Sequence, residues 1–383
     1  MPDTAEQSVL LFSDTVRSPE MRREIAHVVN DPFFYVEHGG KRRVLVRALE
    51  IQRMREVPDL EAHVLEEYGV DDLADSGLRG SDLAFALVVA FCRRLGVQSA
   101  RVPSDFPVAL ADALRGAGIS IQPDPSYFER RQRSKTDGQI AGIRRAQSAA
   151  EAATAAVAAL LRASSVVKGA LHYEDEPLTS ERLKRAARVA LAEHGAVIDE
   201  FIVAHGAQTC IGHHLGSGVV GLGEPVTVDL GPRDPSTGCG TDMTRTFVVG
   251  DVSDELRAYH DLDKRALDAV EPRIAAGVTG AELYATAAAV FEESGYPTLR
   301  TREKGEVLLD GFFHTLGHGV GLRLHEAPHL SPEDERELIE GDVVAIEPGC
   351  YRQGYGGVRL ENVYVVTANG SERITDYSYS LAP

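Results

Sequence analysis

The sequence predicts an α+β protein preceded by a smaller α/β domain, and three observations support this. The first third of the chain alternates strand and helix signals. Further along, capped helices mix with apolar, strand-like runs without strict β–α–β alternation. The length of 383 residues, with 43% hydrophobic and 26% charged residues, is typical of two or three globular domains with a core that needs no disulfides.

The first domain, residues 1–125, is predicted to begin with a hairpin and to continue as strand, helix and strand. Its elements are a hairpin of strands at 33–36 and 43–46, a helix at 81–95, a strand at 100–102, a helix at about 104–115 and a strand at 119–122. Gly39 and Gly40 separate the hairpin strands, as a tight turn requires. Ser81 or its neighbour is the expected N-cap of the first long helix, and Gly96 its stop.

The second domain, residues 126–383, follows a Pro-rich break and a basic stretch. Its predicted helices cover 136–162, 179–195, a segment from about 253, and 279–295. Thr279 and Glu282 have the spacing of a capping box. The clearest strand-like runs are 226–230 and 357–367.

Charge and composition exclude several classes of function. Lys and Arg number 40 and Asp and Glu 58, a formal net charge of −18, so we expect no nucleic-acid partner and no membrane attachment. The sequence shows neither a signal-peptide pattern at its start nor an apolar run of spanning length, so a cytoplasmic protein is expected. The four cysteines form no CxxC pair and are expected to be buried thiols in a reducing compartment.

Two aspartates flank a predicted turn in the second domain. Asp229 stands in an apolar run, where an unpaired carboxylate would cost several kcal/mol. Asp242 follows the Pro- and Gly-rich segment 232–240, which is typical of a loop between two strands. The aspartates would then face each other across a hairpin, within reach of one pair of cations. Asp-rich surface turns are common, so this pair alone is weak support.

Three histidines, His314, His318 and His325, stand at spacings of four and seven in an apolar, Gly-rich stretch. Imidazole is the commonest neutral metal ligand and transfers protons near neutral pH. A single buried histidine is more often a core residue hydrogen-bonded to the backbone than a ligand. Three histidines together favour a metal-binding or catalytic site.

Glu347 and Glu361 each stand in an otherwise apolar run. A buried Glu is almost never left unpaired. One explanation is a buried ion pair, with Arg359 as the candidate partner, and the other is metal binding. Together with the two aspartates and His318 they form an oxygen-rich set of donors with four negative charges, which suits two divalent cations. Such donors favour manganese, with cobalt or zinc as alternatives.

Four stretches, in order, resemble the signatures of the pita-bread metallopeptidases, which include methionine aminopeptidase, aminopeptidase P and prolidase. They are DLG…TDMTRTF, HTLGHGVGLRLHE, IEPG and GGVRLEN. The resemblance runs over roughly residues 135–367, and the additional N-terminal domain is similar to the proline-specific branch. It implies a pita-bread catalytic domain over 126–383, a creatinase-like N-terminal domain over 1–125 and a homodimer.

The resemblance also assigns roles to residues. The metal ligands it implies are Asp229, Asp242, His318, Glu347 and Glu361. His213 and His325 match the two catalytic histidines, with His214 as a neighbour that could be confused with the first. His314 matches a residue of the substrate pocket, and Arg359 an arginine behind the ligands. The two aspartates stand slightly further apart than is usual, which a longer hairpin loop would absorb.

We therefore expect a dinuclear exopeptidase that hydrolyses Xaa-Pro bonds in proline-containing peptides through a metal-bridged hydroxide. Glu347 would shuttle a proton to the leaving nitrogen, while His213 and His325 would donate hydrogen bonds to the oxyanion or orient the substrate. Whether it is an Xaa-Pro aminopeptidase or an Xaa-Pro dipeptidase (prolidase) stays open. A dipeptidase needs a group that binds the free carboxylate of the substrate, for which Arg323 and Arg352 are candidates.

Two other functions are compatible with this fold. One is a metal-free, creatinase-like hydrolase, in which the ligand positions are substituted. The other is a non-catalytic binding protein, and such proteins tend to lose ligands. All five ligand positions carry ligating side chains in this sequence, so the peptidase ranks first.

Overall fold

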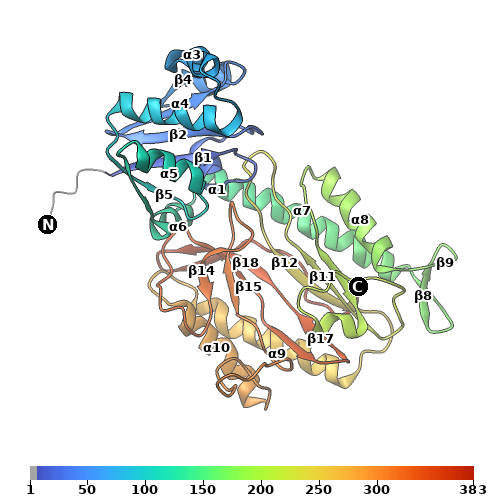
Figure 1. The fold of residues 1–383 in the computed structure, drawn as a ribbon. Helices are drawn as coiled ribbons and strands as arrows, with labels where there is room; N and C mark the ends of the chain where they lie inside the picture. The colour runs from blue at the N-terminus through green and yellow to red at the C-terminus, as the bar shows by residue number, and fades with distance from the viewer. Residues whose placement is uncertain (1–6) are drawn as a thin grey trace. The chain divides into compact units, whose positions relative to one another are not determined.

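The computed structural model describes residues 7–383, which form two compact units, residues 7–132 and 133–383. The division falls within the last turn of α6 (Pro125–Arg133), whereas the sequence-based boundary lies at the start of that helix. Figure 1 shows the first unit in blue to teal and the second in green to red.

The first unit is built on a six-stranded mixed sheet with the order β4-β3-β2-β1-β5-β6. Its strands are β1 (Ser8–Ser13), β2 (Phe33–His38), β3 (Lys41–Val46), β4 (Leu60–Val64), β5 (Ser99–Val102) and β6 (Ser120–Pro123). Its helices, besides α6, are α1 (Pro19–Glu24), α2 (Ile51–Arg55), the 3-10 helix η1 (Leu65–Tyr68), α3 (Val70–Asp75), α4 (Gly80–Leu95) and α5 (Val108–Gly116). The α/β architecture predicted for this region is confirmed.

The local predictions for this unit hold with two corrections. Gly39 and Gly40 turn the β2–β3 hairpin with φ of 60° and 69°, as the two-residue turn requires. Ser81 is not the N-cap of α4, because the helix begins one residue earlier and Arg79 is the cap, without a side-chain bond. Helix α5 begins at Val108 rather than near residue 104, because the residue before Pro107 is disfavoured in a helix.

The second unit contains four groups of strands. A three-stranded sheet has the order β10 (Ile202–His205), β11 (Pro225–Leu230), β12 (Met243–Val248). A five-stranded sheet has the order β14 (Glu326–Leu330), β13 (Gly317–Gly319), β15 (Val343–Ile346), β18 (Asn362–Thr367), β19 (Gly370–Arg373). β16 (Gly349–Arg352) pairs with β17 (Gly356–Arg359), and β7 (Ser165–Val167), β8 (Ala170–Tyr173) and β9 (Glu176–Pro177) form a small ribbon.

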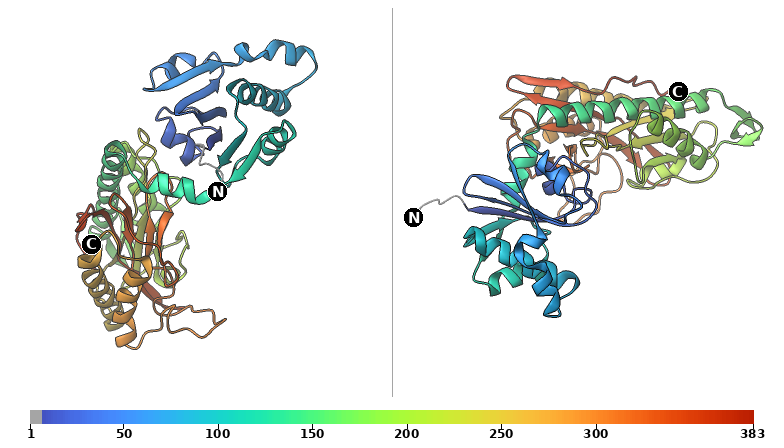
Figure 2. Two further views of the ribbon diagram at one scale, coloured as in Figure 1. Left: turned by 90° about the vertical axis from the view of Figure 1, so that its left-hand side faces the viewer. Right: turned by 90° about the horizontal axis from the view of Figure 1, so that it is seen from above.

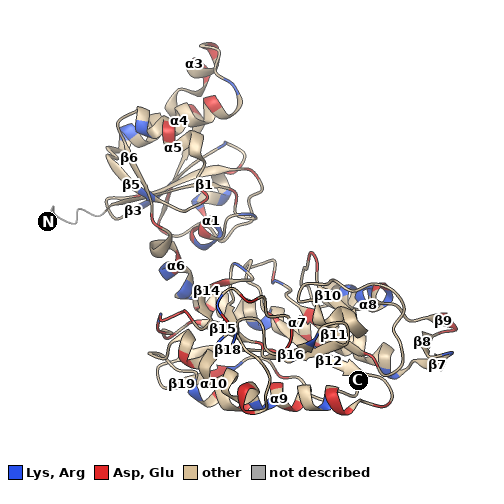
Figure 3. Cartoon of the chain, turned by 60° about the horizontal axis from the view of Figure 1, so that its bottom comes forward, with Lys and Arg blue, Asp and Glu red and all other residues tan. Residues whose placement is uncertain are grey.

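Four long helices cover one side of these strands, as the left view of Figure 2 shows. They are α7 (Asp137–Arg162), α8 (Ser180–Glu193), α9 (Asp254–Val270) and α10 (Gly280–Glu293). The 3-10 helix η2 (Gly206–Cys210) lies between β10 and β11, and η3 (Glu271–Arg273) lies between α9 and α10. Acidic and basic residues follow one another along α9 (Figure 3), as expected of a helix with one solvated side. The predicted α+β class is confirmed.

The four helices begin where the sequence places them, because each starts at a side chain that accepts a hydrogen bond from a backbone N–H. The caps are Thr136, Thr179, Ser253 and Thr279, and the first and last of these form capping boxes. Each such cap is worth about 1 kcal/mol. Among residues 7–383, none of the helices combines the length and the apolar character that a membrane span requires.

One predicted strand is wrong. The run 357–367 forms two strands in different sheets, β17 and β18, and the chain changes partner at Leu360 and Glu361. The Glu361 backbone N–H bonds instead to the Thr244 carbonyl. Glu361 is therefore presented at a strand junction rather than within a strand.

Candidate metal centre

The structure brings the five predicted ligands to one place from five different strand positions. Asp229 lies in β11, Asp242 directly before β12, His318 in β13, Glu347 directly after β15, and Glu361 between β17 and β18. Three overlapping groups of donor atoms lie within 4.8 Å of one another: Asp229, Asp242 and Glu361; His318, Glu347 and Glu361; and Asp242, His318 and His325.

The β11–β12 hairpin presents the two aspartates, although they are not direct cross-strand partners as the sequence had suggested. Asp229 is opposite Thr244, and Asp242 stands two residues before it. The Thr244 hydroxyl donates to the Glu361 carboxylate at 2.8 Å. Thr244 therefore fixes Glu361 beside both aspartates.

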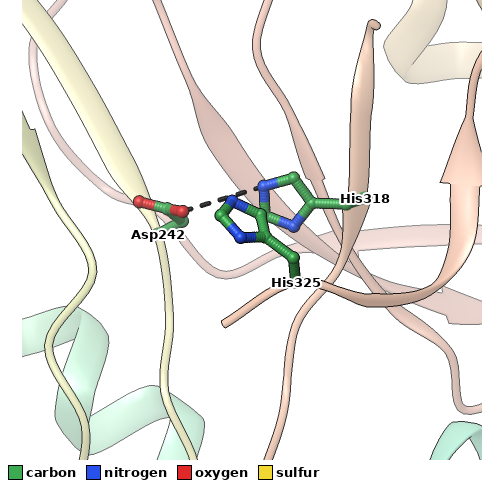
Figure 4. A group of neighbouring side chains, drawn as sticks. All are labelled: Asp242, His318 and His325. Atoms are coloured by element: carbon green, nitrogen blue, oxygen red, sulfur yellow. Dashed lines mark ion pairs between the residues drawn. The ribbon is translucent and has the colours of Figure 1, made fainter. Parts of the chain in front are cut away.

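His318 is oriented for ligation. Its Nδ1–H donates to the Gly319 carbonyl at 3.1 Å, which leaves the Nε2 lone pair facing inward. Nε2 lies 3.8 Å from Asp242 Oδ2 and 3.6 Å from Glu347 Oε1, as Figure 4 shows for Asp242. These distances are too long for hydrogen bonds but suit two donors each about 2.1 Å from a shared cation.

Burial and mutual repulsion perturb the carboxylates. Burial, followed by the charges of the neighbouring acids, raises the pKa of Asp242 and of Glu361 well above the usual range. Burial also raises the pKa of Glu347 to about 7. Glu361 Oε1 is buried and has no hydrogen-bond partner among residues 7–383. Divalent cations would relieve this repulsion, so the donor set fits a hard divalent metal.

Arg359 forms an ion pair with Asp229, one of the carboxylates of the candidate metal centre. Its Nη2 donates to Asp229 Oδ2 at 2.5 Å and its Nη1 to the Tyr351 hydroxyl at 3.1 Å. Although burial opposes its charge, Tyr351 and Asp229 raise the pKa of Arg359. A single arginine bound to one aspartate leaves the remaining negative charge uncompensated. The buried ion pair predicted for Arg359 is therefore present with Asp229. It does not neutralise the other carboxylates of the cluster.

The remaining predicted histidines gather near the same cluster. Burial lowers the pKa of His314 to about 4, and its Nε2 lies 3.0 Å from the Tyr351 hydroxyl. The His325 ring lies 4.2 Å from that of His318, nearly perpendicular to it (Figure 4). Burial, and then the charge of His213, lowers the pKa of His325. His213 is exposed.

His213 is exposed, whereas its neighbour His214 is partly buried. The pKa of His314 is lowered mainly by burial and by the charge of Arg359, with a smaller contribution from His213. His214 Nδ1 accepts a hydrogen bond from Gly216 N at 3.0 Å and is tied to its own loop. His213 is the residue that the family resemblance assigns to the site, and His214 bonds within its own loop.

Sequence reasoning missed two residues of this region, Tyr351 and Thr244. Tyr351 is buried and bridges Arg359 to His314 through its hydroxyl. It stands four residues after Glu347, but only the pairing of β16 with β17 brings it to Arg359. Thr244 lies within the quoted motif, but nothing in the sequence pairs it with Glu361.

The two arginines considered as carboxylate clamps differ in what they contact. Arg352 donates to both oxygens of Glu255, at 2.6 and 2.7 Å, and lies over the Tyr355 ring at 4.2 Å. It is engaged at the surface. Arg323 is exposed in the loop that carries His325.

All four cysteines are buried and unpaired, as predicted. Burial raises the pKa of Cys92 to about 12 and that of Cys239 to about 11. Thiols in this state are poor nucleophiles.

Comparison with known proteins places this architecture in a family. The sequence profile of metallopeptidase family M24 matches residues 141–368, and the chain belongs to this family. Over 179 residues it is 37% identical to an Xaa-Pro dipeptidase of Pyrococcus furiosus, a match that covers 45% of this chain and 46% of that protein. The chain thus spans about half the length of the curated relatives it matches.

Solved structures resemble the fold over nearly the whole chain. An Xaa-Pro dipeptidase from Bacillus anthracis has a TM-score of 0.79 at 24% identity and covers 98% of this chain and 94% of its own. An X-Pro aminopeptidase from Thermotoga maritima has a TM-score of 0.78 at 21% identity, with 98% and 96% covered. These similarities establish the pita-bread fold for the chain.

Proposed function

We propose that this protein hydrolyses Xaa-Pro peptide bonds with two divalent metal ions. The ligands in this proposal are Asp229, Asp242, His318, Glu347 and Glu361. The observation that carries it is the convergence of four carboxylates and one imidazole on a buried spot where a single arginine supplies the only direct cationic contact among the described residues. Membership of the M24 family, and the Xaa-Pro dipeptidases among its relatives, support the reaction and the substrate.

The cations, when bound, would lower the pKa of water so that it attacks a peptide carbonyl near neutral pH. Glu347, whose Oε1 faces His318, would carry the proton from the attacking water to the leaving nitrogen. His325 and His213 would donate hydrogen bonds to the developing oxyanion or orient the substrate. Arg359 would hold Asp229 in place.

His314 would line the pocket for the proline ring. It is surrounded by aromatic residues, with Phe313 and Tyr351 at ring distances of 5.7 and 5.5 Å. An apolar wall of this kind suits a saturated five-membered ring, which has no hydrogen to donate after peptide formation.

The identity of the metal, the cellular location, the oligomeric state and the type of the first unit are each proposed on separate grounds. The oxygen-rich donors favour manganese, with cobalt or zinc as alternatives. Four unpaired cysteines support a reducing, cytoplasmic location. The homodimer, and the assignment of the first unit as a creatinase-like N-terminal domain, rest on the family resemblance.

The test is an assay with two peptides and one control. The purified protein is given manganese, an Xaa-Pro dipeptide, a longer Xaa-Pro-Xaa peptide and the matching Xaa-Ala peptide. We expect cleavage at proline, loss of activity on chelation and its return with metal, and cleavage at alanine slower by about tenfold or more. The ratio of the two proline substrates decides between dipeptidase and aminopeptidase.

Two outcomes would contradict the proposal in different ways. Hydrolysis that survives complete removal of metal would point to the metal-free, creatinase-like chemistry. Stoichiometric metal binding without any hydrolysis would point to a binding protein on the same fold.

A further inference from the structure

A buried ion pair lies directly behind His325. Lys135 Nζ contacts Glu326 Oε1, and both side chains are only 2% exposed. Glu326 follows His325 in the sequence and is the first residue of β14. Buried ion pairs contribute little net stability, because the cost of removing both charges from water offsets their attraction. Stability alone therefore does not account for this pair.

The loop 320–325, which joins β13 to β14, depends on Glu326 for its shape. The His325 ring packs at 4.2 Å against the His318 ring, and Glu326 is the next residue of the chain. Glu326 Oε2 accepts a hydrogen bond from the Arg323 N–H at 3.2 Å, while Oε1 contacts Lys135. One carboxylate thus fixes the chain on both sides of His325.

Gly321 packs onto this ion pair. A Cβ at position 321 would lie 2.8 Å from Glu326 Oε1 and 2.9 Å from Lys135 Cε, closer than real contacts allow. The Gly321 carbonyl meanwhile accepts from the Gly240 N–H at 2.7 Å. Gly321 therefore lies against both the ion pair and the connection between β11 and β12.

We propose that Lys135 is a positioning residue for His325: through Glu326 it holds the loop 320–325 so that the imidazole stands beside His318 and faces the substrate. This inference rests on the proposed function, in which His325 contacts the reacting peptide. Lys135 itself does not touch the donor cluster, and it acts only by fixing the loop.

The chain offers a matched control two residues earlier. Arg133 donates to Asp342 at 2.9 and 2.6 Å, with side chains 10% and 0% exposed. Asp342 also accepts a backbone bond, from Ile339 at 2.8 Å, just as Glu326 does from Arg323. This second pair fixes a turn before β15 that carries none of the site histidines.

The experiment compares two double variants that remove charge but keep the backbone acceptor. They are Lys135→Met with Glu326→Gln, and Arg133→Met with Asp342→Asn. The two should change the thermal midpoint by similar, small amounts, because buried ion pairs contribute little net stability. Only the first should lower kcat on an Xaa-Pro peptide, by about tenfold or more, because a displaced catalytic group loses its effect steeply. KM and manganese affinity should stay within about twofold, since no ligand has moved.

A spectroscopic readout and a third variant accompany the kinetics. In the protein labelled with ¹⁵N-histidine, the ring resonances of His325 should shift in the Lys135→Met/Glu326→Gln protein and remain unchanged in the control. Gly321→Ala, which pushes on the pair from the loop side, should shift the same resonances and lower kcat in the same way.

Equal losses of kcat in the two double variants, or a normal kcat with Lys135 and Glu326 neutralised, would overturn the inference. If the wild-type enzyme with metal bound cleaves no Xaa-Pro peptide, the proposed function fails separately. The positioning role is then tested by the ring resonances of His325 in the Lys135→Met/Glu326→Gln protein. A shift supports this role, and unchanged resonances refute it.

Discussion

The two compact units differ in whether every buried carboxylate has a hydrogen-bond partner. In the described part of the first unit, both buried acids have donors: Asp14 accepts from two backbone N–H groups and from Arg17, and Glu20 from Gln132. In the second unit Glu361 leaves one oxygen without a partner, and Asp263 leaves both. A buried carboxylate with hydrogen-bond partners needs no explanation beyond the fold. One without partners indicates either a ligand-binding site or a cost in folding free energy.

The largest effect is expected at Glu347. Replacing it with alanine should lower kcat on Xaa-Pro peptides by about a thousandfold or more, because the proposed function makes Glu347 both a ligand and the proton carrier. The metal-free protein should not lose stability, since one of the repelling carboxylates is gone. Activity assays in metal-replete buffer beside thermal melts measure both, and near-normal turnover would refute this role.

Asp263 tests whether an unsatisfied acid can lie outside the function. Burial raises its pKa, so the folded state keeps a proton that the unfolded chain loses as the pH rises above about 4. The wild type therefore loses stability as the pH rises. Asp263→Asn should be more stable than the wild type by about 1–3 kcal/mol at pH 8.

Urea unfolding at pH 5 and pH 8 measures this difference. It should be smaller at pH 5, because the free-energy cost of taking up a proton on folding grows as the pH rises above about 4. A loss of stability at pH 8 would show that Asp263 uses its charge, and would then place it with the functional acids rather than outside them.

Tyr351 joins Arg359 to His314, so the Tyr351→Phe variant should lower kcat/KM by about tenfold, the cost of one buried hydrogen-bonded link. The matched control is Tyr355→Phe, whose hydroxyl bonds to Ser253 on a partly exposed surface. Its kcat/KM should stay within about twofold. Equal losses of kcat/KM in the two variants would show that the hydrogen bonds of Tyr351 to Arg359 and His314 have no particular role in catalysis.

The smallest effect is expected at Arg352, whose charge is satisfied by Glu255 at the surface. Arg352→Ala should cost less than about 1 kcal/mol of unfolding free energy, as is usual for exposed ion pairs. Hydrolysis of an Xaa-Pro dipeptide should change by no more than about twofold. A large rise in KM for the dipeptide alone would instead make Arg352 the clamp for the substrate carboxylate.

Features determined by neighbouring residues could be predicted from the sequence. The caps at Thr136 and Thr279 and the Gly39-Gly40 turn follow from local rules, and each formed as expected. Helix α5 begins later than the sequence pattern indicates, because Pro107 disfavours a helical conformation at the residue before it. The acids and histidines of the candidate site were conspicuous because charge in an apolar run is costly wherever the chain folds.

Features determined by pairing between distant strands could not be predicted. Glu361 reads as part of one long strand, yet the chain changes sheets beside it. In the sequence, Tyr351 resembles an ordinary apolar strand residue. Only the pairing of β16 with β17 places Arg359 beside its hydroxyl. Lys135 reads as one of several basic residues before a helix, and only the fold buries it against Glu326.

The central claim is that the four carboxylates and the imidazole of the candidate metal centre hold two cations. Counting bound manganese by calorimetric titration tests it most directly, in the wild type, in Asp242→Asn and Glu361→Gln, and in Glu20→Gln as a control from the first unit. We predict two equivalents per chain in the wild type and the control, and the loss of at least one in each of the other variants. Fewer than one equivalent in the wild type, or a count unchanged by both substitutions, would contradict the account.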